Sequence, residues 1–436
     1  MASKWKSRSR ASLIEVKHGH AFSGEHIREK PRGDILLTPG NFAIGGGFRG
    51  DKFKYFDGEV PEEFVLNDGD LLVTMTDLSK QADTLGYPAF VPRRFDARFL
   101  HNQRLGKVII RPDAGLDQRF LFYLLRTAEY RHEVLASATG TTVKHTSPGR
   151  ILAYKADIPP LPEQKAIAHI LGTLDDKIEL NRRTSETLEA MARAVFKSWF
   201  VDFDPVRAKA AGRNPGLPKP LADLFPDSFE DSELGEIPKA WRVLGLDQLA
   251  RFLNGLALQK YPPKGNRSLP VVKIAQLRAG TTEGADAASA DLERDYIVED
   301  ADVLFSWSGS LECVLRAGGR GALNQHLFKV TSAEHPKWLY YFWIHQHLAD
   351  FRHIAAGKAT TMGHIQRHHL PDAKVVVPQP DLLRAMDRHF GPIVEVIPNL
   401  RVQARTLAAL RDALLPKLLS GEIRVADAER IVGRCT

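Results

Sequence analysis

The chain has 436 residues, enough for two or three domains with separate cores. Its content of 43% hydrophobic and 26% charged residues is that of an ordinary globular protein, and no run of eighteen apolar residues predicts a membrane span. The net charge of +7 and the pI near 9.2 favour an anionic partner, with nucleic acid the leading candidate. Its two cysteines exclude a disulfide scaffold and a cysteine-based zinc site. The basic N-terminus lacks an apolar segment behind it, so a cytoplasmic location is expected.

The first predicted unit spans residues 1–158 and is rich in strands. Strand-like runs lie at 34–38, 70–75 and 107–110, bounded by Gly, Pro, Asp and Asn, and a short helix is predicted at 118–128. A matching unit is predicted at 236–378. Its strand-like runs lie at 271–275, 302–306 and 327–331, followed by a helix at 338–348.

A helix is predicted after each unit, at a proline-marked start. Apolar residues then recur at a mean spacing of 3.5, which is typical of a coiled-coil seam. Gly172 and Gly391 are expected to divide each segment into a short and a long helix. Pro392 and Pro398 predict that the second helix begins or kinks late. The residues predicted to pair the two helices are Leu174, Ile178, Leu188, Val195 and Trp199 in the first and Ile393, Ile397, Leu400, Leu407, Leu414 and Leu418 in the second.

The two halves of the chain repeat one another. Thr141-Thr142-Val143-Lys144-His145 returns as Thr360-Thr361-Met362-Gly363-His364, and 360 − 141 gives an offset of 219 that also relates the two seams. Such a long period indicates two copies of one domain-plus-helix unit. The segment 201–235 between them is rich in Pro, Gly and charge, which suits a tether or a partner-docking arm equally well.

These patterns predict an α+β protein. Two mixed α/β domains are separated by a pair of long antiparallel coiled-coil helices, with a pseudo-two-fold internal repeat. The predicted divisions are 1–158 for the first domain, 159–235 for the central helix and linker, 236–378 for the second domain and 379–436 for the C-terminal helix.

Three motifs that suggest chemistry are weak. Residues 45–50 have the letters of a dinucleotide fingerprint but lead into no helix, so a loop is favoured. Glu163 and Lys165, with Asp157 upstream, have the form of a nuclease site, but Glu163 also suits a helix start. His364, His368 and His369 have helical zinc spacing without further ligands. No catalytic site and no metal site is predicted.

Several polar segments suit the recognition of DNA. Asn and Gln side chains pair with adenine, Arg with guanine, and Thr, Lys and His commonly contact phosphates. A solvated loop or a turn-capping hydroxyl is the alternative for each of these residues. The predicted DNA-binding residues are Asn102, Gln103, Arg104, Thr141, Thr142, Lys144, His145, Lys273, Gln276, Ser306, Trp307, Ser308, Asn324, Gln325, His326, Thr360, Thr361 and His364.

Residues 160–167 (PLPEQKAI) and 171–206 resemble the central region of type I restriction-modification specificity subunits. Segments 269–280, 305–312 and 324–330 resemble their second target-recognition domain, and 414–425 resembles their C-terminal end. The resemblance implies two target-recognition domains that read a bipartite double-stranded DNA sequence.

The same resemblance implies that the helices dock two methyltransferase subunits and that restriction/translocase subunits join the complex. This chain would be a non-catalytic subunit, with S-adenosylmethionine, ATP and magnesium on its partners. A stand-alone DNA nuclease and a structural scaffold without DNA readout are the alternatives.

Overall fold

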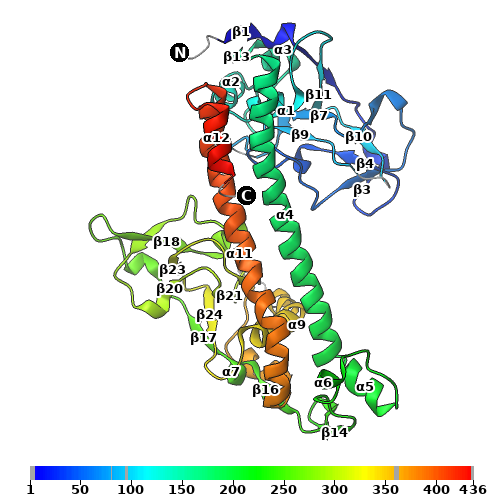
Figure 1. Cartoon of the computed structure of the whole chain (residues 1–436), viewed down its shortest axis with the longest axis vertical. Helices are drawn as coiled ribbons and strands as arrows, with labels where there is room; N and C mark the ends of the chain where they lie inside the picture. Colours follow the sequence, from blue (N-terminus) through cyan, green and yellow to red (C-terminus); the bar gives the residue numbers. More distant parts are fainter. Residues whose placement is uncertain (1–4, 80, 94–96, 358–362, 434–436) are drawn as a thin grey trace. The chain divides into compact units, whose positions relative to one another are not determined.

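The computed structural model describes residues 5–79, 81–93, 97–357 and 363–433. The chain forms two compact units, one comprising residues 1–177 and 407–436, the other residues 178–406. Each unit combines a globular domain with parts of two long helices, α4 (Leu161–Phe200) and α11 (Pro380–Leu419), as labelled in Figure 1. Two strand-rich domains with long helices confirm the predicted α+β class.

The first domain contains two small sheets. One has the order β2 (Ile14–His18), β11 (Leu105–Ile110), β7 (Leu71–Thr74) and β9 (Pro88–Phe90). The other has the order β3 (Ile27–Arg28), β5 (Lys54–Phe56), β4 (Asp34–Leu37), β10 (Phe99–His101) and β6 (Val65–Leu66). Strands β4 and β10 pair in parallel, while the other pairs in these sheets are antiparallel. All four residues of β7 are buried, as expected of a central strand covered on both faces.

The second domain repeats this arrangement. One sheet has the order β17 (Arg251–Asn254), β24 (Leu327–Thr331), β21 (Val303–Ser306) and β22 (Cys313–Leu315). The other has the order β19 (Ala287–Ser289), β18 (Ser268–Val272), β23 (Gly321–Leu323) and β20 (Ile297–Val298). Here too the central pair, β18 and β23, is parallel. The shared strand order and the shared parallel pair establish the internal repeat at the level of the fold.

Shorter elements complete the two units. Unit 1 adds β1 (Lys6–Ser9), β8 (Thr76–Asp77), α1 (Gln118–Leu124), α2 (Ala128–Ala136), β12 (Lys144–His145), α3 (Pro148–Ala153), β13 (Lys155–Ile158) and α12 (Val425–Val432). Unit 2 adds α5 (Asp204–Ala210), α6 (Lys219–Ala222), β14 (Phe229–Ser232), β15 (Gly235–Pro238), β16 (Arg242–Gly245), α7 (Leu246–Leu249), α8 (Ile274–Ala279), α9 (Lys337–Gly357), α10 (His369–Asp372) and β25 (Lys374–Val377). Among the described residues, no helix is long and apolar enough to cross a membrane.

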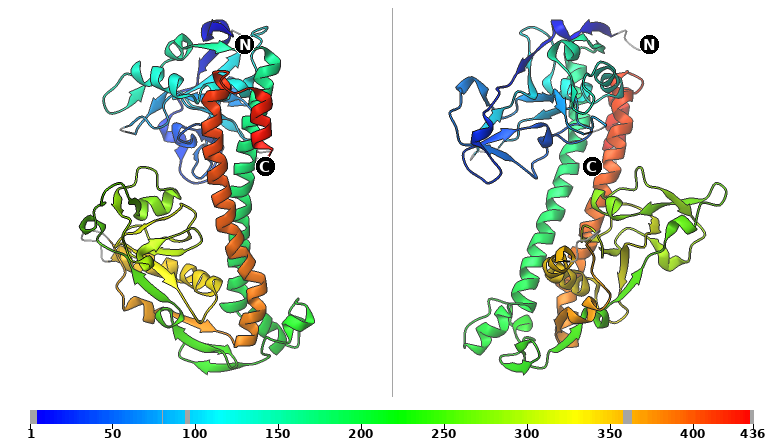
Figure 2. Two further views of the ribbon diagram at one scale, coloured as in Figure 1. Left: turned by 60° about the vertical axis from the view of Figure 1, so that its left-hand side comes forward. Right: turned by 180° about the vertical axis from the view of Figure 1, so that it is seen from behind.

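In unit 2, helices α4 and α11 pair antiparallel through buried polar and aromatic contacts (Figure 2). The Asn181 side chain, only 3% exposed, donates a hydrogen bond of 2.8 Å to Gln403 Oε1. Further along α4, the Phe196 ring lies 6.3 Å from the ring of Phe390 on α11. A buried polar side chain in an apolar seam favours one register, because a slip would leave the Asn181 amide without this partner.

In unit 1, the first part of α4 pairs with the last part of α11 around Asp175. Its carboxylate accepts hydrogen bonds from Tyr123 Oη at 2.7 Å, Arg126 Nη1 at 3.0 Å and Arg411 Nη1 at 2.6 Å. Burial opposes ionisation of this group, but the attraction of Arg126 and Arg411 outweighs it and lowers the pKa of Asp175. One carboxylate thus joins the domain helix α1 and its following loop to both long helices.

The predicted seam residues occupy different depths. Leu174, Ile397, Leu407, Leu414 and Leu418 are buried, while Ile178, Leu188, Trp199, Ile393 and Leu400 are half-buried. The prediction is wrong for Val195, which is 37% exposed. Its buried neighbours are Ala192 and Phe196, because a straight helix of 3.6 residues per turn drifts away from a strict 3.5 spacing.

The expected breaks in the long helices are also wrong, since both are continuous over 40 residues. Gly172 leaves α4 intact, and neither Pro392 nor Pro398 ends α11. A proline inside a helix costs about 3 kcal/mol. Fully burying an apolar side chain contributes about 1.5–3 kcal/mol, and Phe390, Val394 and Ile397 on this stretch are each at most 2% exposed. Tertiary burial therefore outweighs the local preference.

The segment after α4 is folded, so the tether interpretation is wrong. Its residues form α5, α6 and the β14–β15 hairpin. Val206, Leu221 and Phe225 are at most 9% exposed and belong to the main core of unit 2. These apolar residues, spaced among many polar ones, anchor a segment whose average composition resembles a linker.

We predict that Asp175→Asn destabilises the chain by about 3 kcal/mol at neutral pH, because two partly buried guanidinium groups lose their counter-charge. Urea unfolding measures the difference. Asp176→Asn is the matched control, since Asp176 is exposed on the same turn, and its free energy of unfolding should change by less than about 0.5 kcal/mol. Equal destabilisation by both substitutions would contradict the role of the Asp175 cluster.

Candidate nucleic-acid interface

In the first domain, the turn between β10 and β11 packs against the residues that follow β2. The backbone N–H of His20 donates to His101 O at 2.8 Å, and that of Gln103 donates to His20 O at 2.9 Å. A Cβ atom added to Gly19 would lie 2.3 Å from Asn102 O, so only glycine permits this approach. The turn therefore projects from a fixed support.

Two further segments extend this support. The backbone N–H of Met75 donates to Arg104 O at 2.8 Å, and that of Thr146 donates to Met75 O at 2.9 Å. Beside them, β12 pairs with β8, and Thr76 Oγ1 lies 3.1 Å from His145 Nδ1. Predicted DNA-binding residues that are some forty positions apart in sequence, at 102–104 and 144–145, are thereby brought together.

The second domain builds the same hydrogen-bonded support. Gln325 N–H donates to Leu256 O at 2.9 Å, Trp307 N–H to His326 O at 3.3 Å, and Ile365 N–H to Trp307 O at 2.9 Å. Gly255 replaces Gly19, with its hypothetical Cβ again 2.3 Å from a carbonyl oxygen, that of Asn324. We call this arrangement the turn frame. It consists of residues 19–20, 75, 102–105 and 146 in the first domain and 255–256, 307, 324–327 and 365 in the second.

The two asparagines of the turn frames have a structural role. Asn102 Oδ1 accepts the Arg104 N–H at 2.9 Å, and Asn324 Oδ1 accepts the His326 N–H at 3.2 Å. Such side-chain-to-backbone bonds hold a turn in shape. Asn324 is only 6% exposed, so its predicted bidentate pairing with adenine is not supported by the geometry, whereas the pairing of Asn102 stays a prediction. The neighbouring Gln103 and Arg104 are exposed, while Gln325 and His326 are half-buried.

Two predicted serine contacts are wrong. Ser306 is fully buried, and its hydroxyl donates to Ser310 O at 2.7 Å and accepts the Glu312 N–H at 2.8 Å. Ser308 is 3% exposed, and its hydroxyl lies 2.9 Å from His326 Nδ1. Both side chains face inward and stabilise the second turn frame, so neither is free to meet DNA.

The other predicted residues of the second domain lie around the same turn. Trp307 is half-buried, with its ring centroid 5.7 Å from that of His326 and 6.2 Å from that of His364. Lys273 precedes α8, where its N–H donates to Gln276 Oε1 at 3.3 Å. The adjacent Val272 O accepts the Asn324 N–H, which brings α8 to the turn. DNA contacts by these side chains remain predictions.

The segment before β12 is the remaining predicted contact region. Thr141 and Thr142 are exposed and Lys144 is half-buried. Thr360 and Thr361, the equivalents in the second domain, lie outside the described residues. The phosphate contacts of Thr141, Thr142 and Lys144 stay predictions.

The buried carboxylate of Asp77 supports the loop beside β12. It accepts hydrogen bonds of 2.7 Å from the Ser79 N–H and the Thr84 hydroxyl. Burial opposes its charge, but these bonds outweigh that effect and lower the pKa of Asp77. These hydrogen bonds hold the ionised carboxylate inside the loop and fix the loop's shape.

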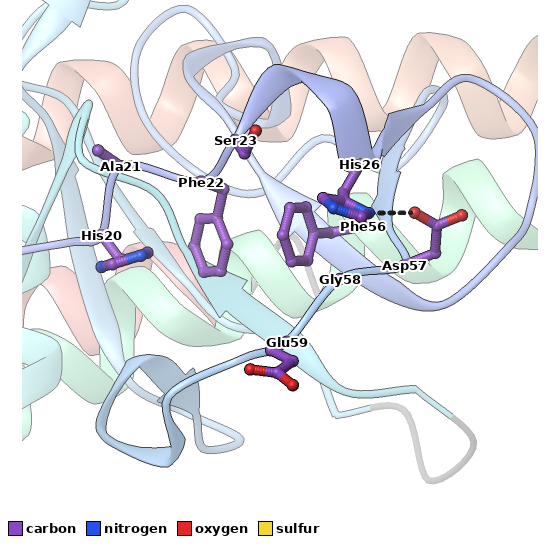
Figure 3. A pocket seen from close by; sticks show the side chains of 9 residues that line it. All are labelled: His20, Ala21, Phe22, Ser23, His26, Phe56, Asp57, Gly58 and Glu59. Atoms are coloured by element: carbon purple, nitrogen blue, oxygen red, sulfur yellow. Dashed lines mark hydrogen bonds and ion pairs between the residues drawn. The ribbon is translucent and has the colours of Figure 1, made fainter.

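An open hollow of about 770 Å³ lies next to the first turn frame and is lined by His20 (Figure 3). Its walls include the rings of Phe22 and Phe56, which meet edge to face with their centroids 4.8 Å apart. Asp57 and Glu59 also line it, and Asp57 accepts a hydrogen bond from Arg28 at 3.1 Å. Arg32 Nε lies 3.0 Å from the same carboxylate, so two guanidinium groups balance the charge of Asp57.

The structure does not support the three motifs that were considered for catalysis and metal binding. No group of three or more His, Cys, Asp or Glu side chains in the described part of the chain could hold a metal ion. Residues 43–47 form a turn rather than a helix start, and Arg126 Nε donates to Gly45 O at 2.6 Å. Between Glu163 and Lys165, the buried Gln164 donates to Gly115 O at 2.9 Å and Pro159 O at 2.8 Å. That motif fixes the start of α4.

Comparison with known proteins supports the resemblance. The model of the type I restriction modification DNA specificity domain matches residues 2–190. The HindI specificity subunit of Haemophilus influenzae is 25% identical over 374 residues, covering 72% of this chain and 80% of the relative. The chain is thus similar to type I restriction-modification specificity subunits, and the family model covers residues 2–190 of it. The MjaIX specificity subunit of Methanocaldococcus jannaschii is 26% identical over 340 residues, covering 75% of this chain and 73% of that relative.

A solved structure supports the fold of this chain. The type I restriction-modification S subunit from M. genitalium aligns with a TM-score of 0.52 and 15% identity, covering 95% of this chain and 96% of that one. At this identity the similarity concerns the fold alone. The turn frames are an observation on the present chain and do not rest on that similarity.

The sequence analysis did not identify the residues that hold the turn frames in place, although a second repeat offset points to the two glycines. Gly19 and Gly255 are separated by 236 residues (255 − 19), as are Trp5 and Trp241 (241 − 5). This second offset differs from 219 because the domains differ in loop length. The role of Met75 has no such signal, since its counterpart is a tryptophan.

We predict that His101, buried beneath the first turn, makes stability fall in mild acid. It is 3% exposed, and burial lowers its pKa from 6.5 to about 4. The unfolded chain therefore binds this proton at higher pH than the folded chain, and stability is lost as the pH falls from about 6.5 to about 4. The loss amounts to about 3 kcal/mol.

His101→Leu tests this, because leucine occupies the equivalent position 323 in the second domain. Urea unfolding at neutral pH and at about pH 4.5 should show a smaller loss of stability in the variant than in the wild type. The same pH dependence in both proteins would contradict the assignment.

Proposed function

We propose that this chain is the DNA-reading subunit of a type I restriction-modification complex. It recognises a bipartite double-stranded target and directs adenine methylation or restriction by partner subunits. One observation carries the proposal: the turn frame occurs once in each domain, with the same hydrogen bonds and with side chains of base-reading type at its tip. Two rigid readers of one design suit a target in two parts.

The same proposal gives this chain a non-catalytic role in the cytoplasm. S-adenosylmethionine, ATP and magnesium would then be bound by the partner subunits. Magnesium-dependent cleavage of DNA by the isolated chain would favour the nuclease alternative instead.

The partners we propose are two methyltransferase subunits, joined by restriction/translocase subunits. The methyltransferase subunits would dock on the long helices. Leu180 and Met191 on α4 support this, since they are 57% and 59% exposed although they are large and apolar. The two residues are about three helical turns apart, so they lie on one face of α4.

Domain exchange tests the proposal. Residues 14–153 are replaced by the equivalent segment of a specificity subunit with another target, and the complete complex is expressed in cells. Mapping of methylated adenine should show one half of the recognised sequence changed and the other half retained. The reciprocal exchange of residues 251–373 is the control, and it should change only the half that the first exchange preserved.

The two outcomes separate the alternatives. A scaffold without DNA readout predicts an unchanged target after both exchanges. If only one domain reads DNA, one exchange should alter the whole target and the other should alter nothing. Either result would contradict two-part recognition.

A further inference from the structure

The two turn frames carry different side chains at one equivalent position. Position 104 in the first domain and position 326 in the second both follow the Asn-Gln pair. Each has its N–H bound to the asparagine side chain and its carbonyl bound by the N–H of residue 75 or 307. Since the backbone is held alike in both domains, a difference in recognition here must come from the side chain.

In the first domain this side chain is an exposed arginine. Arg104 lies beside exposed Gln103 and near the β12 strand that carries Lys144 and His145. A guanidinium group donates two parallel hydrogen bonds to the O6 and N7 atoms of guanine, the commonest specific contact in the major groove. The fixed turn reduces the entropy lost when such a side chain is positioned.

In the second domain the side chain is a restrained ring. His326 Nδ1 is 2.9 Å from Ser308 Oγ, and the ring centroid lies 5.7 Å from that of Trp307. The Trp307 indole is itself fixed, donating to Asn254 Oδ1 at 2.9 Å and to Gln325 O at 3.1 Å. A short imidazole held in this way cannot form the forked contact of arginine with guanine.

We propose that positions 104 and 326 are specificity-determining residues that make the two half-sites differ. Arg104 selects a guanine in the half read by the first domain. His326, restrained by Ser308 and Trp307, selects another base at the equivalent place in the other half. This inference rests on the proposed function, and it names the residues by which two domains of one design read unlike sequences.

The exchange variants Arg104→His and His326→Arg test it in cells with the complete system, by mapping methylated adenine. Arg104→His should lose the requirement for guanine at one position of one half-site. His326→Arg should acquire a requirement for guanine at one position of the other half-site. Arg111→His is the control, because Arg111 is exposed in the same domain beyond the end of β11 and should leave the motif unchanged.

A second measurement does not depend on how the variants fold. Each guanine of the mapped first half-site is replaced by 7-deazaguanine, which lacks the N7 acceptor, and binding of the wild-type complex is measured. At one guanine the affinity should fall about tenfold. If Arg104→His remains able to bind, it should be insensitive to that replacement.

These experiments distinguish a failure of the proposed function from a failure of the assignment of Arg104. If the wild-type system produces no two-part methylation motif, the proposed function is wrong. If the motif exists but no 7-deazaguanine replacement weakens wild-type binding, the assignment of Arg104 is wrong and the proposed function stands. A motif unchanged by both exchange variants would overturn the roles of positions 104 and 326.

Discussion

The paired helices α4 and α11 are the constraint on which each unit depends, and their polar contacts fix how they pair. In unit 2 Asn181 binds Gln403, and Glu189 accepts hydrogen bonds from Tyr341 at 2.7 Å and from Arg401 at 2.6 Å. In unit 1 Asp175 makes the corresponding contacts, with Tyr123 and Arg411. Each carboxylate joins a helix of the globular domain to both long helices. Because an unpaired buried charge costs several kcal/mol, these contacts restrict both helix register and domain attachment.

Within each domain, the turn frame transfers that rigidity to the surface. The close approach at Gly19 and Gly255 fixes the turn against a neighbouring segment, and the asparagine side chain closes it. The side chains at the tip of the turn can differ between the two domains, because the frame is built from backbone contacts. This separation of a constant backbone from variable side chains explains how a duplicated domain reads different sequences without a different fold.

The sequence predicted the repeat and the fold class, because the 219-residue offset and the turn residues are local signals. It did not predict continuous helices, since the burial around Pro392 and Pro398 depends on tertiary packing. Ser306 was misassigned because strand alternation cannot distinguish the buried from the exposed face in a covered sheet. Val195 was misplaced by the small difference between 3.5 and 3.6 residues per turn.

The most direct test of two-part recognition is a map of methylated adenine in cells with and without this chain, in the presence of its partner subunits. We expect methylation at one gapped motif with two defined halves, lost when the chain is removed and restored when it is supplied again. An identical map in both cells, or methylation at a single uninterrupted motif, would contradict the function argued from the duplicated turn frame.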